Sequence, residues 1–177
     1  MRMKNPVVNS SRPDLTLLEV LDARHRVVAA MSPGRVHSQG LWHQRAAALV
    51  YSKDGSLMVS RRSPQCPDCP LGWDVSLSEH VYLGCSVYET VRAGLYARLG
   101  GTFSKLRLAH VLGASPQTDN EILTVYSVHS ATDLKPDADR DEMMLLQAHE
   151  VDALVHAFPG QVSSTLRFLH ASGLLFG

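Results

Sequence analysis

The sequence of 177 residues lacks the features that would place it in a specialised class. No apolar run approaches the roughly 20 residues that span a bilayer, so we expect no membrane segment. Neither charge is in excess, with 17 Lys and Arg against 17 Asp and Glu, which gives no reason to expect a nucleic-acid partner. Three cysteines are too few for a disulfide framework and indicate a reducing compartment. We therefore expect a cytoplasmic protein.

What is present is the composition of an ordinary globular domain. Hydrophobic residues make up 45% of the chain, enough at this length for one buried core. The first fourteen residues are polar and contain two prolines, so we expect a loose N-terminal arm over 1–14 and a single domain over 15–177. Nothing in the sequence fixes the oligomeric state, and a homodimer is compatible with it.

Short apolar segments separated by turn residues predict a mixed β-sheet with helices on both faces. Residues 35–42 are expected to be a polar connector between strands. Strands are expected over 15–21, 27–31, 45–51, 56–61, 103–112, 121–130 and 142–147. Further helices are expected over 148–158 and 162–175.

The stretch 71–101 carries the clearest local signals for secondary structure. It predicts a strand, a turn carrying His80, and an amphipathic helix. Ser86 and Glu89 have the spacing of a capping box, so the helix should begin at Ser86. Apolar residues at helical spacing predict a buried stripe, and two glycines at 100–101 end the helix.

Three histidines and two acidic residues form a candidate site outside this helix. Asp119 and Glu121 lie two residues apart on a predicted strand and so share one face. Together with the imidazoles they would make a plausible sphere for a divalent metal. The alternative is that the five residues have separate surface and capping roles. The set is His37, His43, His80, Asp119 and Glu121.

The spacing of the stretch 71–101 resembles the box that defines the Nudix superfamily. In that family a loop glycine and a glutamate precede a helix that carries Arg-Glu-x-x-Glu-Glu. Here the frame fits when it is anchored on His80 and Gly100, but other residues stand at the defining positions. They are Glu79 for the glycine, Cys85 for the first glutamate, Ala93 and Gly94 for Arg-Glu, and Ala97 and Arg98 for the metal-binding pair.

Three further segments resemble the isopentenyl-diphosphate isomerase branch of that superfamily. They are R-V-H-S-Q-G-L-W-H from residue 35, G-W-D-V-S-x-x-E-H-V from residue 72, and D-N-E-I-L-T-V-Y from residue 119. The resemblance implies an α/β (α+β) fold, a Nudix-like α/β/α sandwich around a mixed sheet. It also implies that the five residues named above bind one divalent metal, Mg²⁺, Mn²⁺ or Zn²⁺.

The same resemblance implies roles in catalysis. Glu121 matches a catalytic glutamate and is the leading candidate for acid–base work. Ser78 stands where the isomerase has a cysteine, and a hydroxyl is a far weaker acid–base group than a thiol. His110 falls near a catalytic tyrosine and could move a proton at neutral pH, although a solvent-facing strand histidine is the alternative.

The arginines match part of the diphosphate-binding site that the resemblance implies. Arg62, which follows Arg61, matches a diphosphate-binding arginine, and the guanidinium fork suits phosphate. Cys66 stands where a lysine accompanies it, and the role of the Cys66-x-x-Cys69 pair stays open. Arg98 either grips a phosphate directly or extends into water.

Three functions remain open. The chain is a metal-dependent, isomerase-like enzyme acting on a small diphosphate, or a Nudix-type diphosphate hydrolase with a relocated base. The third hypothesis is a catalytically inactive Nudix-fold protein that binds a ligand. Loss of the helix carboxylates favours the third, whereas the His/Asp/Glu set favours the first.

Overall fold

The computed structural model describes residues 14–66, 68–99, 103, 105–130, 134 and 143–176. The arm predicted over 1–14 lies outside this part of the chain except for Asp14, which begins the first strand. The predicted helix stop at 100–101 also lies outside it.

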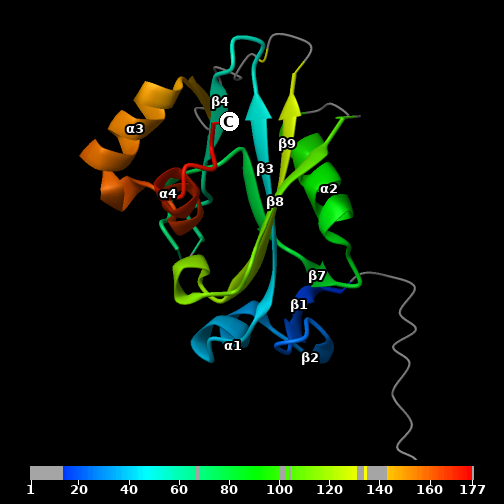
Figure 1. Ribbon diagram of the computed structural model, residues 1–177. Helices are drawn as coiled ribbons and strands as arrows, with labels where there is room; N and C mark the ends of the chain where they lie inside the picture. Colours follow the sequence, from blue (N-terminus) through cyan, green and yellow to red (C-terminus); the bar gives the residue numbers. More distant parts are fainter. Residues whose placement is uncertain are drawn as a thin grey trace, which may run out of the picture.

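A mixed sheet in the order β10-β4-β3-β9-β8 forms the centre of the molecule (Figure 1). β3 (His43–Tyr51) and β9 (Glu121–His129) run parallel side by side, and the other pairings are antiparallel. Two short strands extend the sheet, one pairing with β4 and one with β3. The remaining bounds are β4 (Leu57–Arg61), β5 (Trp73–Asp74), β6 (Leu77–His80), β8 (Arg107–Leu112) and β10 (Met143–Leu146).

Helices cover both faces of this sheet because β3 is apolar on both sides. Ala46, Ala48 and Val50 belong to a core cluster shared with α2 (Val87–Leu99). The alternate residues of β3 belong to a second cluster, shared with α3 (Ala148–Ala157) and α4 (Ser164–Ala171). The alternation follows from the two-residue period of a strand. The predicted α/β/α sandwich with a mixed sheet is therefore confirmed.

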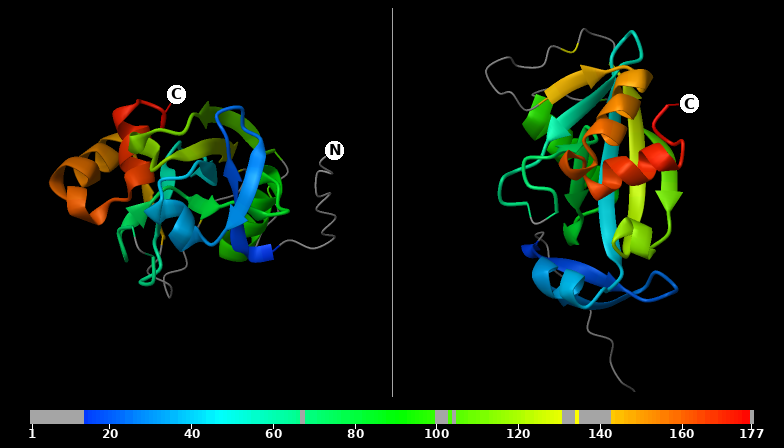
Figure 2. Two further views of the ribbon diagram at one scale, coloured as in Figure 1. Left: turned by 90° about the horizontal axis from the view of Figure 1, so that it is seen from below. Right: turned by 90° about the vertical axis from the view of Figure 1, so that its left-hand side faces the viewer.

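A smaller sheet lies beyond one end of the main sheet (Figure 2). It contains β1 (Asp14–Leu21), β2 (Val27–Met31) and β7 (Tyr82–Leu83), in the order β2-β1-β7. The helix α1 (Pro33–Ser38) packs on it through Val36, which is fully buried against Leu18 and Val20. The polar connector predicted for 35–42 was wrong, since α1 spans 33–38. Its proline fits the first helical turn, and one buried residue leaves no amphipathic period to detect.

The capping box of α2 is confirmed. The Ser86 hydroxyl accepts a hydrogen bond from the Glu89 N–H at 3.2 Å, and the Glu89 carboxylate accepts one from the Ser86 N–H at 3.2 Å. Val91 and Leu95 of the predicted stripe are fully buried. His80 ends β6 instead of lying in a turn, which fixes its direction more firmly than a loop would.

Other predicted bounds needed correction. The C-terminal helix predicted over 162–175 is shorter, because Val162 forms a parallel bridge with Trp73 and Ser163 caps the first turn of α4. The strand predicted over 103–112 begins at Arg107. Of residues 131–142, which precede β10, only Leu134 is described.

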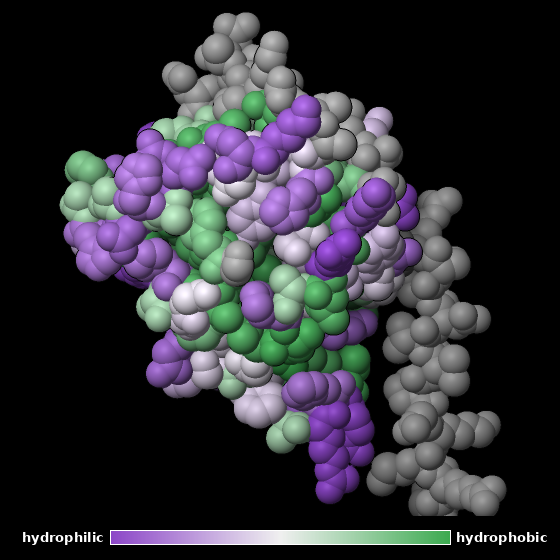
Figure 3. All heavy atoms as spheres, turned by 45° about the horizontal axis from the view of Figure 1, so that its top comes forward, coloured by the Kyte–Doolittle hydropathy of each residue, from purple (hydrophilic) through white to green (hydrophobic). Residues whose placement is uncertain are grey.

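The surface is mixed in character. Apolar groups cross one face as a band between hydrophilic zones (Figure 3), and Leu108 and Val111 are exposed on the edge strand β8. None of the described helices is both long and apolar enough to cross a bilayer. Cys66, Cys69 and Cys85 are free thiols.

Candidate metal centre

Four potential metal ligands meet where the two sheets adjoin. His37 is on α1, His43 begins β3, His80 ends β6 and Glu121 begins β9. The parallel register pairs His43 with Glu121, and the β3–β6 register brings His80 opposite Arg45. As a result, one donor atom from each of the four ligands lies within 4.8 Å of the others.

Three distances between the donor atoms can be compared with those of ligands on one ion. The Nε2 atoms of His37 and His80 are 2.9 Å apart. Oε1 of Glu121 lies 3.3 Å from Nε2 of His43 and 3.3 Å from Nε2 of His80. Ligands bound to one ion at about 2.1 Å stand roughly 3.0–3.4 Å apart in octahedral or tetrahedral geometry. These three distances are close to that range, and all four donor atoms lie within 4.8 Å of one another.

The outer nitrogens of two imidazoles are already engaged, which directs their inner nitrogens to the cluster. Nδ1 of His43 donates to the carbonyl of Leu41 at 2.9 Å, and Nδ1 of His37 contacts Oδ2 of Asp119 at 2.9 Å. His43 is 1% exposed, and within the described part of the chain its Nε2 has no hydrogen-bond partner. An unsatisfied buried acceptor is costly, and a metal ion would satisfy it, so the residues fit a divalent metal.

Asp119 lies outside this group of four. It follows a short 3₁₀ turn, η1 (Pro116–Thr118), in the left-handed region with φ of 53°. Its side chain is 60% exposed and contacts the nitrogen of His37 that faces away from the cluster. The structure thus brings four of the five predicted ligands together and gives Asp119 a place from which it orients His37.

Arg45 is a member of the site that our sequence analysis missed. Its guanidinium donates to Glu121 Oε1 at 2.9 Å and to Ser78 Oγ at 2.8 Å, and its Nη1 lies 3.3 Å from Nε2 of His80. The available signal was its position two residues after His43, at the head of an apolar strand, which puts both side chains on one face.

The electrostatics keep Glu121 ionised and His80 neutral. Burial alone would raise the pKa of Glu121, but the neighbouring imidazoles of His43 and His80 and the charge of Arg45 hold it well below its ordinary value. Burial lowers the pKa of His80, and Arg45 adds to this effect, against the opposing pull of Glu121. Both shifts leave the donors in the protonation states that a metal requires.

A cavity of about 810 Å³ opens over the cluster, and four arginines line it. Arg62 is buried, paired with Asp74 at 2.5 Å, and donates to Cys66 Sγ at 2.7 Å. Arg61 lies over the Trp73 ring at 4.8 Å. An adjoining cavity of about 340 Å³ shares Arg61, Arg62 and Arg98 with the first.

Arg98 brings α2 to this cavity. Its guanidinium lies 3.3 Å from Ser60 Oγ and 3.5 Å from Glu79 Oε1. One turn earlier, Gly94 is packed so closely on β6 that a Cβ there would lie 2.7 Å from a methyl carbon of Leu77. The inner face of α2 therefore presents a cation to the cavity and packs closely on β6.

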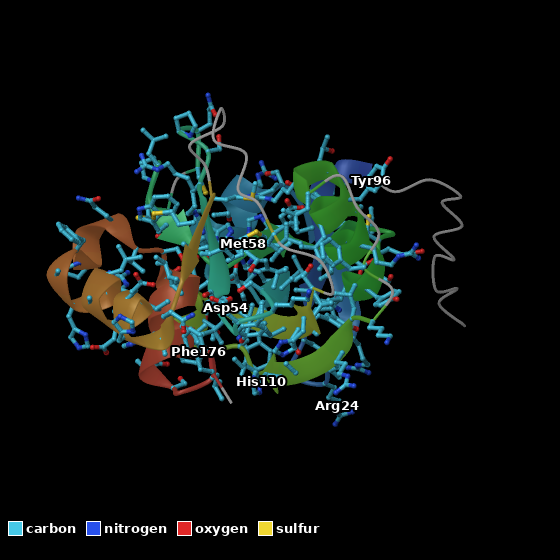
Figure 4. All side chains as sticks on the ribbon, turned by 90° about the horizontal axis from the view of Figure 1, so that it is seen from above. Arg24, Asp54, Met58, Tyr96, His110 and Phe176 are labelled. Atoms are coloured by element: carbon cyan, nitrogen blue, oxygen red, sulfur yellow. The ribbon has the colours of Figure 1, made fainter. Side chains whose placement is uncertain are left out.

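The two remaining candidates lie in different places. Ser78 lines the cavity, and its hydroxyl accepts the hydrogen bond from Arg45 described above. His110 is on β8 opposite Val125, at the edge of the sheet (Figure 4), and does not line the cavity.

Comparisons with known proteins identify the architecture. No protein-family profile and no curated protein sequence matches the chain. The crystal structure of DR0079 from Deinococcus radiodurans aligns with a TM-score of 0.72 and 21% identity, covering 88% of this chain and 98% of that one. The MutT protein from Methanosarcina mazei Go1 aligns with a TM-score of 0.55 and 16% identity, covering 72% and 89%.

An NMR structure of DR0079, described as a hypothetical Nudix protein, aligns with a TM-score of 0.46 and 18% identity over 92% of this chain and 97% of that one. At that score the alignment adds nothing to the crystal structure. The crystal structure of DR0079 matches over nearly its whole length, which shows that the two chains share an overall fold. The chain therefore has a Nudix-like fold.

Proposed function

We propose that this chain is a metal-dependent hydrolase of the Nudix kind that acts on a small diphosphate. The observation that carries the proposal is the convergence of His37, His43, His80 and Glu121 beside a cavity that all but His43 line together with four arginines. The four clustered residues supply donor atoms for a metal, and the arginines supply positive charge for a phosphorylated substrate.

The four ligands would hold one divalent ion. Three imidazoles with one carboxylate favour Zn²⁺ over Mg²⁺, which prefers oxygen ligands. A bound ion of this kind polarises a phosphoryl oxygen and lowers the pKa of a water molecule. Asp119 orients His37, and Leu41 orients His43, through the outer nitrogens of the two rings.

Arginines position the substrate. Arg61, Arg62 and Arg98 face two adjoining cavities, so they can hold phosphates at some distance from the cluster. Arg62 is pre-oriented by Asp74, which limits the freedom that its fork loses on binding. Arg98 supplies positive charge for the substrate's phosphates at the position where Nudix hydrolases place metal-binding glutamates.

Glu79 is our candidate for the relocated base. Asp68, Asp74, Asp119 and Glu121 also line the larger cavity, but each is held by a hydroxyl, an arginine or a histidine. Of the cavity's described carboxylates, Glu79 alone accepts no hydrogen bond, and Arg98 is 3.5 Å away. With 39% of its side chain exposed, Glu79 can accept a proton from an attacking water.

Isomerisation is the second candidate function, because Ser78 lines the same cavity as Glu121 of the cluster. Against it, Arg45 donates hydrogen bonds to both residues and holds them in a fixed pair. A carboxylate with a strongly lowered pKa is also a weak base. We therefore favour hydrolysis. A cytoplasmic location, favoured by the free thiols, and a homodimer remain predictions.

The test is NMR in D₂O with Zn²⁺ or Mg²⁺ on the protein mixed with nucleoside diphosphates or isopentenyl diphosphate. We expect ³¹P signals of released phosphate. A Glu79→Gln variant should lose about 10²–10⁴-fold in rate, as expected for removal of a general base, while it still binds the metal.

Other outcomes decide between the remaining hypotheses. Deuterium entering the isoprenoid without phosphate release would overturn hydrolysis in favour of isomerisation. If neither wild type nor Glu79→Gln changes any of the substrates, the protein binds a ligand without catalysing a reaction. The control Arg24→Gln changes an exposed arginine at the periphery (Figure 4) and should match wild type.

A further inference from the structure

Arg45 occupies an unusual position for a permanent cation. Its Nη1 is 2.9 Å from Glu121 Oε1 and 3.3 Å from Nε2 of His80, so it contacts two of the four atoms that would bind a metal. A guanidinium does not lose its proton in proteins. Any metal ion at the cluster therefore has a fixed positive charge beside it.

The guanidinium is also held in place. Its Nε donates to Ser78 Oγ at 2.8 Å, and only 9% of the side chain is exposed. Its backbone lies in β3, between β6 and β9, where the register opposes it to His80 and Leu123. These contacts hold the guanidinium beside the cluster, on the side where it lines the cavity.

The charges of this inner group do not balance once a metal is added. The imidazoles are neutral ligands, and the charge of Arg45 already offsets that of Glu121. A divalent ion would leave two positive charges in excess in a largely buried site. Asp119, which contacts His37 from the outer side, is exposed, so water screens its charge.

We propose that Arg45 makes the binding of a divalent metal and of a phosphoryl anion mutually dependent. Alone, the metal is opposed by the guanidinium, and an anion in the cavity lined by Arg45 removes that opposition. Such coupling is reciprocal, so the metal strengthens anion binding by the same factor. The inference rests on the proposed function, because it takes the four-residue cluster as the metal site.

The experiment measures the dissociation constant of Mn²⁺, from the EPR signal of the free ion, with and without inorganic phosphate. In wild type we expect phosphate to tighten Mn²⁺ binding about tenfold or more, within the usual range of coupling between sites. Arg45→Gln should bind Mn²⁺ more tightly than wild type when phosphate is absent, and phosphate should change its affinity by less than about twofold.

Two variants control for charge. Arg45→Lys keeps the positive charge and should keep the coupling, whereas Arg24→Gln removes an exposed arginine and should behave as wild type. Circular dichroism checks folding, and Arg45→Met, with a side chain of similar reach, replaces Arg45→Gln if that variant unfolds.

The outcomes separate this inference from the proposed function. If wild type binds Mn²⁺ equally well with and without phosphate, the metal site stands and the coupling is wrong. The coupling is also wrong if the neutral variant keeps the full phosphate effect. If neither wild type nor the neutral variant binds Mn²⁺ under any condition, the metal site itself fails and the inference fails with it.

Discussion

The buried residues His80 and Glu121 predict how the stability of the protein depends on pH. The pKa of His80 is lowered from 6.5, so the unfolded chain takes up a proton there more readily than the folded one. The contribution of His80 to the free energy of unfolding is fully present above pH 6.5 and decreases as the pH drops below 6.5. Glu121, with a pKa lowered from 4.5, adds a second loss below that value.

Urea unfolding in EDTA between pH 7.5 and 4 measures this dependence. We expect the free energy of unfolding to decrease on acidification, first through His80 and then through Glu121. His80→Gln should remove the first decrease, whereas His149→Gln, at an exposed position on α3, should retain it. An unchanged decrease between pH 7 and 5 in His80→Gln would contradict the role given to burial.

Single residues show what a sequence reveals about a site. His37, His43, His80 and Glu121 were found through the resemblance of the segments that carry them. Arg45 escaped because an arginine at the head of a strand is ordinarily exposed. Its function depends on contacts with β6 and β9, which the sequence does not place.

The helix α2 depends on the absence of a side chain at Gly94. A Cβ there would lie 2.7 and 2.9 Å from the two methyl carbons of Leu77, which is fully buried. Gly94→Ala should therefore destabilise the protein by about 1–3 kcal/mol, as overpacking does, although alanine is the better helix former.

The control is the reverse change one residue earlier, at an exposed position. Ala93→Gly should reduce stability by about 1 kcal/mol through helix propensity alone. Thermal unfolding followed by circular dichroism compares the two variants. A Gly94→Ala protein more stable than wild type would mean that propensity outweighs the contact with Leu77.

Elements with strong local signals were predicted well. The capping box placed the start of α2, and the apolar run of β3 was recognised as a strand. The helix α1 was missed because its six residues bury only Val36. Its omission mattered, since α1 is the element that carries His37 to the other ligands.

For the whole molecule, the alternation of helical and strand patterns predicted a mixed sheet with helices on both faces, and the family resemblance implied the sandwich. The sequence could not show that the parallel pair β3–β9 begins with His43 opposite Glu121, because that register depends on tertiary packing. The parallel pair and the adjoining small sheet together create the site. Because this geometry joins segments far apart in the chain, the sequence alone did not show that the four side chains lie together.

The central claim is that this fold assembles a metal site, and equilibrium dialysis with metal analysis tests it most directly. Wild type dialysed against low Zn²⁺ should retain about one ion per chain, and the variant His43→Ala with Glu121→Gln should retain almost none. His110→Gln, outside the cavity, should retain the wild-type amount. Equal zinc in wild type and the double variant, or none in either, would contradict the account.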